Sequence, residues 1–391
     1  MRAALVVFRK EVRENVRDRR TLLNTLFLGP FLLPLLFLVV IRTQVTRQLD
    51  KADEPLSLPV IGAEYAPNLV ESLKQQGVHI LPGPADPERA VRERDADVVL
   101  RIPERYPDDW QRGQPAQVEI VFDQSQRDAA GPVARLRGLL EGYSQRAGTL
   151  RLLARGLSPS LDRPVLVAER DQSTPQGRAG IIFGFLPFTF IFAALLGGLA
   201  LAVDTTAGER ERQSLEPLMA NPVRPGEILL GKLAATSAFA TMTLALSLLA
   251  FSVIGRFMPV ERIGMALELG PRFVSCTFVV MVPLAVLFSA LQTLVGSYAK
   301  SYREAQAYLS LLTLVPIVPS MILNLIPIKT KLWMHAIPLM GQQVTITRLI
   351  RGESPPVIAM VLSVVCTSLA AVCVYFFTAR LYRSERLTIT T

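Results

Sequence analysis

One stretch of the sequence has the residue types and spacing of a nucleotide site. Gly226 to Lys232 reads Gly-Glu-Ile-Leu-Leu-Gly-Lys and matches seven positions of the phosphate-binding P-loop. The eighth position needs a hydroxyl for Mg²⁺, but Leu233 stands there, and no buried strand precedes the stretch. We therefore predict that this chain does not hydrolyse ATP, and that any energy from ATP enters through a separate subunit.

Other side chains suited to catalysis or metal binding are sparse. The cysteines, Cys276, Cys366 and Cys373, all fall within apolar stretches, so they indicate neither a disulfide framework nor a zinc site. His335 stands near Trp333 between two apolar stretches, and we interpret it as a membrane-interface residue. The sequence predicts no catalytic residue, no bound cofactor and no metal site.

A charged segment between two long apolar stretches is the most informative part of the chain. It begins with Gly208, Glu209, Arg210, Glu211 and Arg212. A charge at the centre of a bilayer costs about 3 kcal/mol or more. We therefore expect these side chains to lie in water or against another protein.

The same segment continues with a short apolar ridge. Leu215, Leu218 and Met219 are spaced as i, i+3 and i+4, so a helix would place them on one face that can dock into a groove of a partner. The charges around the ridge, including Glu216, would set register and orientation more than affinity. The alternative is a solvated loop whose charges only keep it in the cytoplasm.

The composition is that of a protein with several membrane spans. Of the 391 residues, 50% are hydrophobic, the mean hydropathy is +0.34, and the apolar residues come in blocks of about 20. The net charge of +9 comes from basic residues beside these blocks, without aromatic interleaving. Membrane orientation explains this charge better than nucleic-acid binding does.

The predicted fold is an α-helical polytopic membrane protein with an inserted extracytoplasmic α/β domain. The six predicted transmembrane helices cover residues 21–41, 179–203, 228–254, 273–298, 305–326 and 357–379. The other predicted parts are an interfacial helix (1–20), the α/β domain (42–178), a cytoplasmic coupling segment (204–227), external re-entrant or gate helices (327–356) and a cytoplasmic tail (380–391).

The N-terminal residues predict an amphipathic helix on the inner leaflet. Apolar residues recur at helical spacing, while Arg9, Lys10, Arg13 and Arg17 occupy the other faces. An ordinary cytosolic surface helix is the alternative. Because the number of spans is even and both ends are basic, we expect both termini in the cytoplasm.

The polar region after the first span predicts a folded domain. Short runs typical of strands occur at 58–62, 97–102, 118–122 and 164–168, and three-to-four spacing predicts helices at 67–76, 87–94 and 131–155. Alternating strands and helices are typical of an α/β domain that buries its own core.

This arrangement resembles the permease subunits of ABC-2 type transporters over nearly the whole chain. The motif match lies in Gly208 to Arg212, Leu215 to Leu218, Pro222-Val223 and Gly231-Lys232. The resemblance implies a cell-membrane exporter of an ion, drug, lipid or peptide that works as a homodimer or pseudo-dimer. It also implies a partner ABC ATPase subunit that binds ATP and Mg²⁺ and pushes on the charged segment.

The N-terminal sequence from Phe8 to Leu22 resembles the NatB-like, sodium-exporter branch, which implies Na⁺ as a cargo. Asp204, Gln292 and Asn324 are the candidates for an ion or polar pathway, although Asp204 would also suit pairing with the N-terminal helix. The predicted spans carry no ionisable residue in their central parts, so an organic cargo fits at least as well as Na⁺.

A membrane-anchored receptor or scaffold, sensing a ligand through the α/β domain, is the alternative function. A receptor needs a signalling domain in the cytoplasm, and the predicted inner loops are short. The sequence therefore favours transport.

Overall fold

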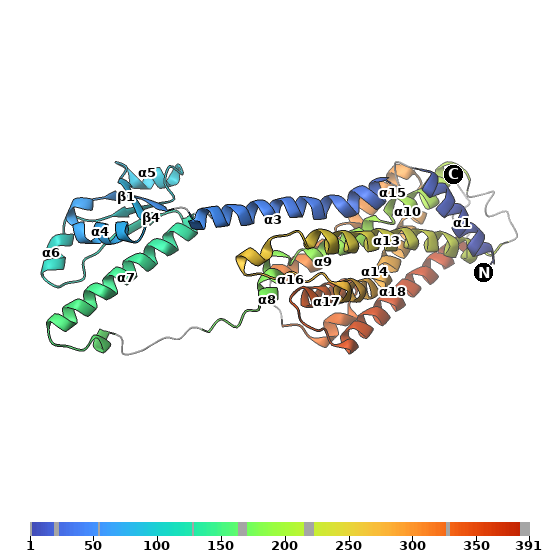
Figure 1. Ribbon diagram of the computed structural model, residues 1–391. Helices are drawn as coiled ribbons and strands as arrows, with labels where there is room; N and C mark the ends of the chain where they lie inside the picture. The colour runs from blue at the N-terminus through green and yellow to red at the C-terminus, as the bar shows by residue number, and fades with distance from the viewer. Residues whose placement is uncertain are drawn as a thin grey trace. The chain divides into compact units, whose positions relative to one another are not determined.

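The structure is a computed structural model that describes residues 2–18, 23–53, 55–126, 129–162, 170–214, 223–325 and 329–383. The chain forms two compact units (Figure 1). Met1–Thr46 and Gln172–Thr391 make the helical unit, and Arg47–Asp171 make the α/β unit. The predicted fold class is confirmed, since helices predominate and the described sheet is small and mixed.

The first part of the helical unit contains an amphipathic helix and the elements of the first two spans. These are α1 (Arg2–Arg17), η1 (Leu23–Leu28), α3 (Gly29–Asp53, whose last residues enter the α/β unit), α8 (Pro175–Ile182), α9 (Leu186–Leu196), α10 (Leu199–Val203), η5 (Asp204–Gly208) and α11 (Glu209–Glu211). Two turns are π-helical: η1 leads directly into α3, and η5 lies between α10 and α11. Such turns often mark functional positions in helices.

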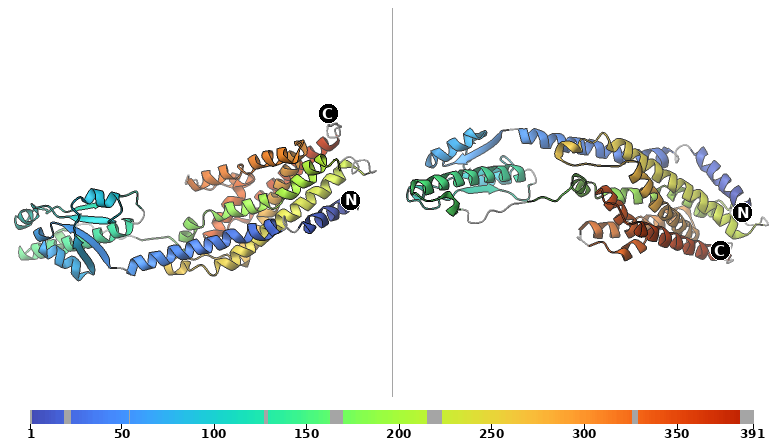
Figure 2. Two further views of the ribbon diagram at one scale, coloured as in Figure 1. Left: turned by 90° about the horizontal axis from the view of Figure 1, so that it is seen from above. Right: turned by 60° about the horizontal axis from the view of Figure 1, so that its bottom comes forward.

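The second part contains the remaining long helices. These are α13 (Pro225–Gly255), η6 (Val260–Ile263), α14 (Pro271–Tyr298), α15 (Tyr302–Leu312), α16 (Ile317–Leu325), η7 (Leu332–Ala336), α17 (Met340–Ile350) and α18 (Val357–Arg383). Figure 2 shows α13, α14 and α18 side by side, and α14 packs against both of its neighbours and against α9 and α17.

In the described part of the chain, six helical stretches have the length and apolar composition needed to cross a bilayer. They are Thr25–Arg47, Leu186–Glu211, Pro225–Gly255, Pro271–Tyr298, Tyr302–Leu323 and Val357–Tyr382. The number agrees with the prediction. The second stretch continues through Glu211, because η5 and α11 extend the helix into the charged segment.

Glycines let the second span approach its neighbours closely. A Cβ on Gly198 would lie 2.8 Å from Thr236 Cγ2 on α13, and one on Gly296 of α14 would lie 2.2 Å from Thr206 Oγ1 on η5. Side chains at these positions would force the helices apart. The Gly197-Gly198 pair of the sequence therefore makes packing contacts within the chain.

The α/β unit is built on a four-stranded sheet. Its elements are β1 (Leu56–Ile61), η2 (Ala63–Tyr65), α4 (Pro67–Gln75), β2 (Val78–Pro82), α5 (Pro87–Arg92), β3 (Val98–Arg101), α6 (Tyr106–Gln111), β4 (Glu119–Phe122), α7 (Ala130–Ala154) and η4 (Pro159–Asp162). The strand order is β2-β1-β3-β4. β1 runs parallel to β2 and β3, and β4 runs antiparallel to β3.

The core of this unit lies on one face of the sheet. Leu58 and Leu100 point into it and meet Leu73 of α4 and Leu136 of α7, all of them fully buried. Val99 points to the opposite face, where α5 contacts β3 and β4. Because parallel neighbours need crossover connections, α4 and α5 connect β1 to β2 and β2 to β3.

Three of the predicted strands correspond to β1, β3 and β4, and three predicted helices correspond to α4, α5 and α7. The predicted strand at 164–168 lies outside the described residues. β2 and α6 were not expected. β2 contains His79 and ends at Pro82, so it lacks the continuous run of apolar and β-branched residues that marks β3.

Candidate functional site

A close helix crossing brings the N-terminal helix against the start of the third span. α1 lies on α13 at Gly231, where a Cβ would stand 2.7 Å from the Ala4 carbonyl oxygen and 2.7 Å from Val7 Cβ. Glycine at 231 is therefore what permits the two backbones to approach. Phe8 and Val12 of α1 then pack against a cluster that includes Phe239 of α13.

At this crossing the structure groups four charges, which we call the charge cluster: the buried Glu11, Glu209 and Lys232, and Lys10, whose side chain is 40% exposed. Lys232 is 0% exposed and Glu209 is 5% exposed. The Lys232 ammonium donates hydrogen bonds to the Glu209 Oε2 atom and, at 2.6 Å, to the Thr205 carbonyl oxygen. Lys10 Nζ lies 3.0 Å from the other Glu209 oxygen, Oε1. One carboxylate thus binds lysines from two helices, α1 and α13.

Two further carboxylates lie near Lys10: Glu11, which belongs to the charge cluster, and the exposed Glu14, which lies beside it. Glu11 Oε1 lies 3.2 Å from Lys10 Nζ, and Glu14 Oε2 lies 3.5 Å from it. Burial alone would lower the pKa of Lys10, but its hydrogen bond to Glu209 and the charges of Glu11 and Glu209 raise it. Burial raises the pKa of Glu11 above its ordinary value of 4.5, against the opposing charges of Lys10 and Lys232.

The charges that follow Glu209 bind other helix ends. Arg210 Nη1 donates to the Ala299 carbonyl oxygen at 3.0 Å, just beyond the end of α14. Glu211 Oε2 accepts a hydrogen bond from the backbone N–H of Tyr302 at 2.7 Å, at the first residue of α15. Such groups satisfy carbonyl and N–H groups that helix ends leave without partners.

The last charge of the run is held within its own helix. Arg212 Nη2 lies 2.7 Å from Asp204 Oδ1, so the two side chains form an ion pair. Residues 209–212 therefore connect α1, α13, α14 and α15 to the end of the second span. The arrangement therefore links several helix ends to one short segment.

Several expectations for this region need correction. Glu209 was expected in water or against another protein, but it is buried within the chain, because Lys232 and Lys10 neutralise it. Asp204 was considered a partner of the N-terminal helix, but it pairs with Arg212, which lies two helical turns further on. Lys10 was assigned only to the membrane interface and is also a member of the charge cluster.

Sequence reasoning missed the role of Lys232. The pair Gly231-Lys232 was considered as part of an incomplete P-loop and as part of the family motif, but not as a buried charge, although a lone lysine near the start of an apolar span is itself a signal. A buried charge requires a partner of opposite sign, and Glu209 is an acidic residue at the end of the preceding span.

Other predicted site residues lie elsewhere or outside the described residues. Residues 215–222 lie outside the described residues, and they include Leu215, Glu216, Leu218 and Met219. The side chain of Asn324 is also outside the description. Arg9, Arg13 and Arg17 are exposed on α1. Gly208 is buried at the end of η5, where a Cβ would stand 3.2 Å from Asp204 Oδ1.

Two polar residues in the span region are buried rather than exposed. Gln292 of α14 is 0% exposed and donates its Nε2 to the Leu195 carbonyl oxygen at 2.6 Å, while its Oε1 has no hydrogen-bond partner among the described residues. His335 was expected at the membrane interface but is buried, with its Nδ1 atom 3.3 Å from Thr345 Oγ1. Neither belongs to a metal-binding group in the described part of the chain.

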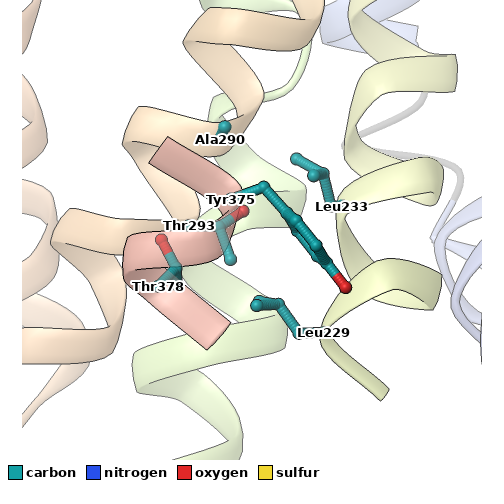
Figure 3. Close-up of a pocket in the computed structure, with 6 residues that line it drawn as sticks. All are labelled: Leu229, Leu233, Ala290, Thr293, Tyr375 and Thr378. Carbon is teal, nitrogen blue, oxygen red and sulfur yellow. The ribbon is translucent and has the colours of Figure 1, made fainter. Parts of the chain in front are cut away.

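A narrow pocket lies beside the start of α13 (Figure 3). It is lined by Leu229, Leu233, Ala290, Thr293, Tyr375 and Thr378 of α13, α14 and α18. Its empty volume is about 150 Å³, whereas ligand pockets usually measure about 300–1,000 Å³. Tyr375 closes the pocket toward α13 and donates its hydroxyl to the Gly226 carbonyl oxygen at 3.2 Å. The pocket is a packing feature and too small for a cargo molecule.

Comparisons with known proteins cover both units. A family profile described as ABC-2 family transporter protein matches residues 5–379. The chain is also 24% identical over 379 residues to the ABC transporter permease protein NatB of Bacillus subtilis (strain 168), a similarity that covers 96% of each chain. The matched residues include the charge cluster and the whole α/β unit.

The two buried carboxylates of the charge cluster predict opposite mutational effects. Glu209→Gln leaves Lys232 buried without a carboxylate partner, so we expect a loss of about 3–5 kcal/mol in the free energy of unfolding. Glu11→Gln is the matched control. Because the pKa of Glu11 is raised, its acid form is favoured in the fold, and glutamine resembles that form.

Thermal unfolding of the purified protein, followed across pH, measures both effects. Glu11 contributes most to stability at low pH, and its contribution falls as the pH rises through its raised pKa. The Glu11→Gln variant should therefore match wild type at low pH and equal or exceed it at neutral pH. Equal destabilisation by both substitutions at neutral pH would contradict this account.

Proposed function

The chain belongs to the ABC-2 family of transporter proteins, and we propose that it exports its cargo with energy from a separate ATPase subunit that pushes on residues 208–219. As a permease, the chain is the non-catalytic transmembrane subunit. We further propose that both termini and this segment lie in the cytoplasm, and that two permease chains work together. The apolar side chains exposed along α3 and α18 offer surfaces for lipid or for a second permease.

The anchoring of residues 209–212 is the observation that supports this mechanism best. A push applied to this segment reaches α1 and α13 through Glu209, the end of α14 through Arg210, and the start of α15 through Glu211. Because packed helices move as rigid bodies, a displacement at one point rotates them together. ATP-driven closure of the ATPase subunits would thus switch the spans between inward- and outward-facing states.

The charges and the ridge of this segment have separate roles in the proposal. Glu209 is buried in contacts within the chain, so it is not available to set orientation on the ATPase, whereas Glu211 accepts one hydrogen bond from α15 and stays exposed. The apolar ridge of Leu215, Leu218 and Met219 remains the proposed docking surface. Gln213 and Ser214, which precede the ridge, are exposed.

We also propose an organic, amphipathic cargo in preference to Na⁺. The hydroxyl groups of Ser289, Thr293 and Ser297 donate to carbonyl oxygens one turn earlier on their own helix α14. The described spans place their Asp, Glu, Lys and Arg side chains toward their ends, as Glu209 and Lys232 illustrate. A bare cation needs carboxylates or unwound carbonyls near the midplane, and this pattern supplies poor ligands for it.

The proposed topology is tested by labelling single cysteines in intact cells. Cys276, Cys366 and Cys373 are replaced first, and a cysteine is placed at Ser125 or Gln213, both of which are exposed. A membrane-impermeant maleimide should label position 125 from outside and position 213 only after permeabilisation. Labelling of position 213 in intact cells would reverse the proposed orientation.

The proposed docking ridge is tested by Leu215→Asp, with Gln213→Asp as a control that adds the same charge two residues away. Leu215→Asp should abolish co-purification of the ATPase and ATP-dependent transport, because a carboxylate in an apolar groove is costly to desolvate. Gln213→Asp should retain both. The assignment fails if both variants bind and transport alike.

The proposed cargo class is tested in inverted vesicles that contain the chain and its ATPase. We expect no ATP-dependent accumulation of ²²Na⁺, and ATP hydrolysis that does not respond to Na⁺. A catalytically inactive ATPase provides the background. Accumulation of the ion that is reduced by Asp204→Ala, Gln292→Ala or Asn324→Ala would overturn the proposal.

A further inference from the structure

The far end of α7 in the α/β unit exposes leucines that the unit itself does not cover. The first half of α7 packs on the sheet through the buried Val133 and Leu136. Beyond it, Leu150 is 67% exposed, Leu153 55%, Leu157 44% and Leu161 62%. We call these four leucines and the backbone that carries them the α7 tip. Scattered leucines are common on protein surfaces, but four grouped at one helix end need an explanation.

The backbone holds the α7 tip in a defined shape. Gly156 has a φ of +73°, and its N–H donates to the Leu153 carbonyl oxygen at 2.9 Å. The N–H of Leu157 donates to the Leu152 carbonyl oxygen at 2.9 Å, which completes a Schellman cap. η4, which carries Leu161, then folds back against α7. Leu150 and Leu153 are spaced as i and i+3 on α7, so they share one side of the helix, and Leu157 follows directly after the cap at Gly156.

The charges around these leucines are predominantly positive. From Gln145 to Asp162 the sequence carries Arg146, Arg151 and Arg155 and one acidic residue, Asp162, which follows Leu161. Arg146 and Arg155 are exposed. Arg151 lies with its guanidinium carbon 4.2 Å from the centre of the Trp110 ring, which fixes the helix against α6. The α7 tip therefore combines an apolar side with positive charge.

We propose that the α7 tip docks on a bilayer surface that contains anionic phospholipid. Leucines facing the acyl boundary and arginines facing phosphates are the pattern of an interfacial helix. A second copy is a poorer occupant, since pairing two tips would bring Arg146, Arg151 and Arg155 of each copy together with only Asp162 to offset their charge. Both ends of the α/β unit continue into candidate spans or the helix before one, so the unit stays tethered to the bilayer at high effective concentration.

The test uses the full chain in nanodiscs, with the native cysteines replaced and an environment-sensitive NBD dye attached at position 153. The matched control is the same dye at Leu81, an apolar residue of β2 that is 43% exposed and lies outside the tip. Discs are made from phosphatidylcholine with and without phosphatidylglycerol. Quenching is measured with nitroxide-labelled lipid and with aqueous iodide.

We expect dye at position 153 to be quenched by the nitroxide lipid several-fold more than dye at 81, and more strongly when phosphatidylglycerol is present. Arg146→Gln with Arg155→Gln should remove the dependence on phosphatidylglycerol. Leu150→Ser with Leu157→Ser should remove lipid quenching at 153 in both disc types. These side chains are exposed, so the unit should keep its fold, which circular dichroism verifies.

Other outcomes overturn the proposal. Equal iodide quenching at 153 and 81 would mean that the tip remains in water. Protection from both quenchers, together with cross-linking of two chains through a cysteine at 153, would identify a second copy as the occupant. If the dye is protected from both quenchers and Val165→Ser removes this protection, residues 163–169 of the same chain cover the tip. If the nitroxide lipid quenches the dye at 153 equally with and without phosphatidylglycerol, the tip does not recognise anionic lipid.

Discussion

The carboxylate of Glu209 binds two lysines that come from different helices, and the helical unit is organised around this interaction. Lys232 is fully buried, and a buried ammonium without a carboxylate would cost several kcal/mol. The requirement fixes the end of the second span against α13. Lys10 adds α1 to the same carboxylate, and Gly231 gives α1 the space to reach it. Alternative positions of these three elements would separate the charges, so the position of the charged segment is strongly specified.

This constraint explains how a short segment can act on a large assembly of helices. Arg210 and Glu211 extend the connection to the end of α14 and the start of α15. The segment therefore has few independent motions, and a partner that displaces it must displace the helices as well. In the mechanism that we propose for this ABC-2 permease, the separate ATPase subunit moves the spans through this connection.

The sequence predicted the features that depend on local pattern. Long apolar blocks predicted six spans, and alternating strand and helix patterns predicted the α/β unit. β1, β3, β4 and their helices lie close to the predicted positions. The run Gly208 to Arg212 was also identified from sequence as the part of the chain where charge and membrane spans meet.

The features that depend on contacts distant in sequence could not be predicted. Glu209 and Lys232 are 23 residues apart, and Lys10 and Glu209 are 199 residues apart. Charge alone suggested that Glu209 faces water, because its partners follow from how the end of the second span packs against α13 and α1. The burial of His335 beside Thr345 has the same cause, since it depends on how η7 packs against α17. The sequence therefore identified the charged segment as important. Only the packing of the helices shows which of its charges form contacts within the chain.

We infer that the charged segment, α1 and the start of α13 move as one body. Pulsed electron resonance on the assembled transporter measures this motion, with spin labels at the exposed positions Arg13 on α1 and Gln213 on the segment. Trapping the ATPase subunits closed with ATP should leave the distance between these labels unchanged. The distance from Gln213 to a label at the exposed Arg351, just beyond α17, should change in the same experiment. A change between Arg13 and Gln213 as large as the change to Arg351 would contradict the account.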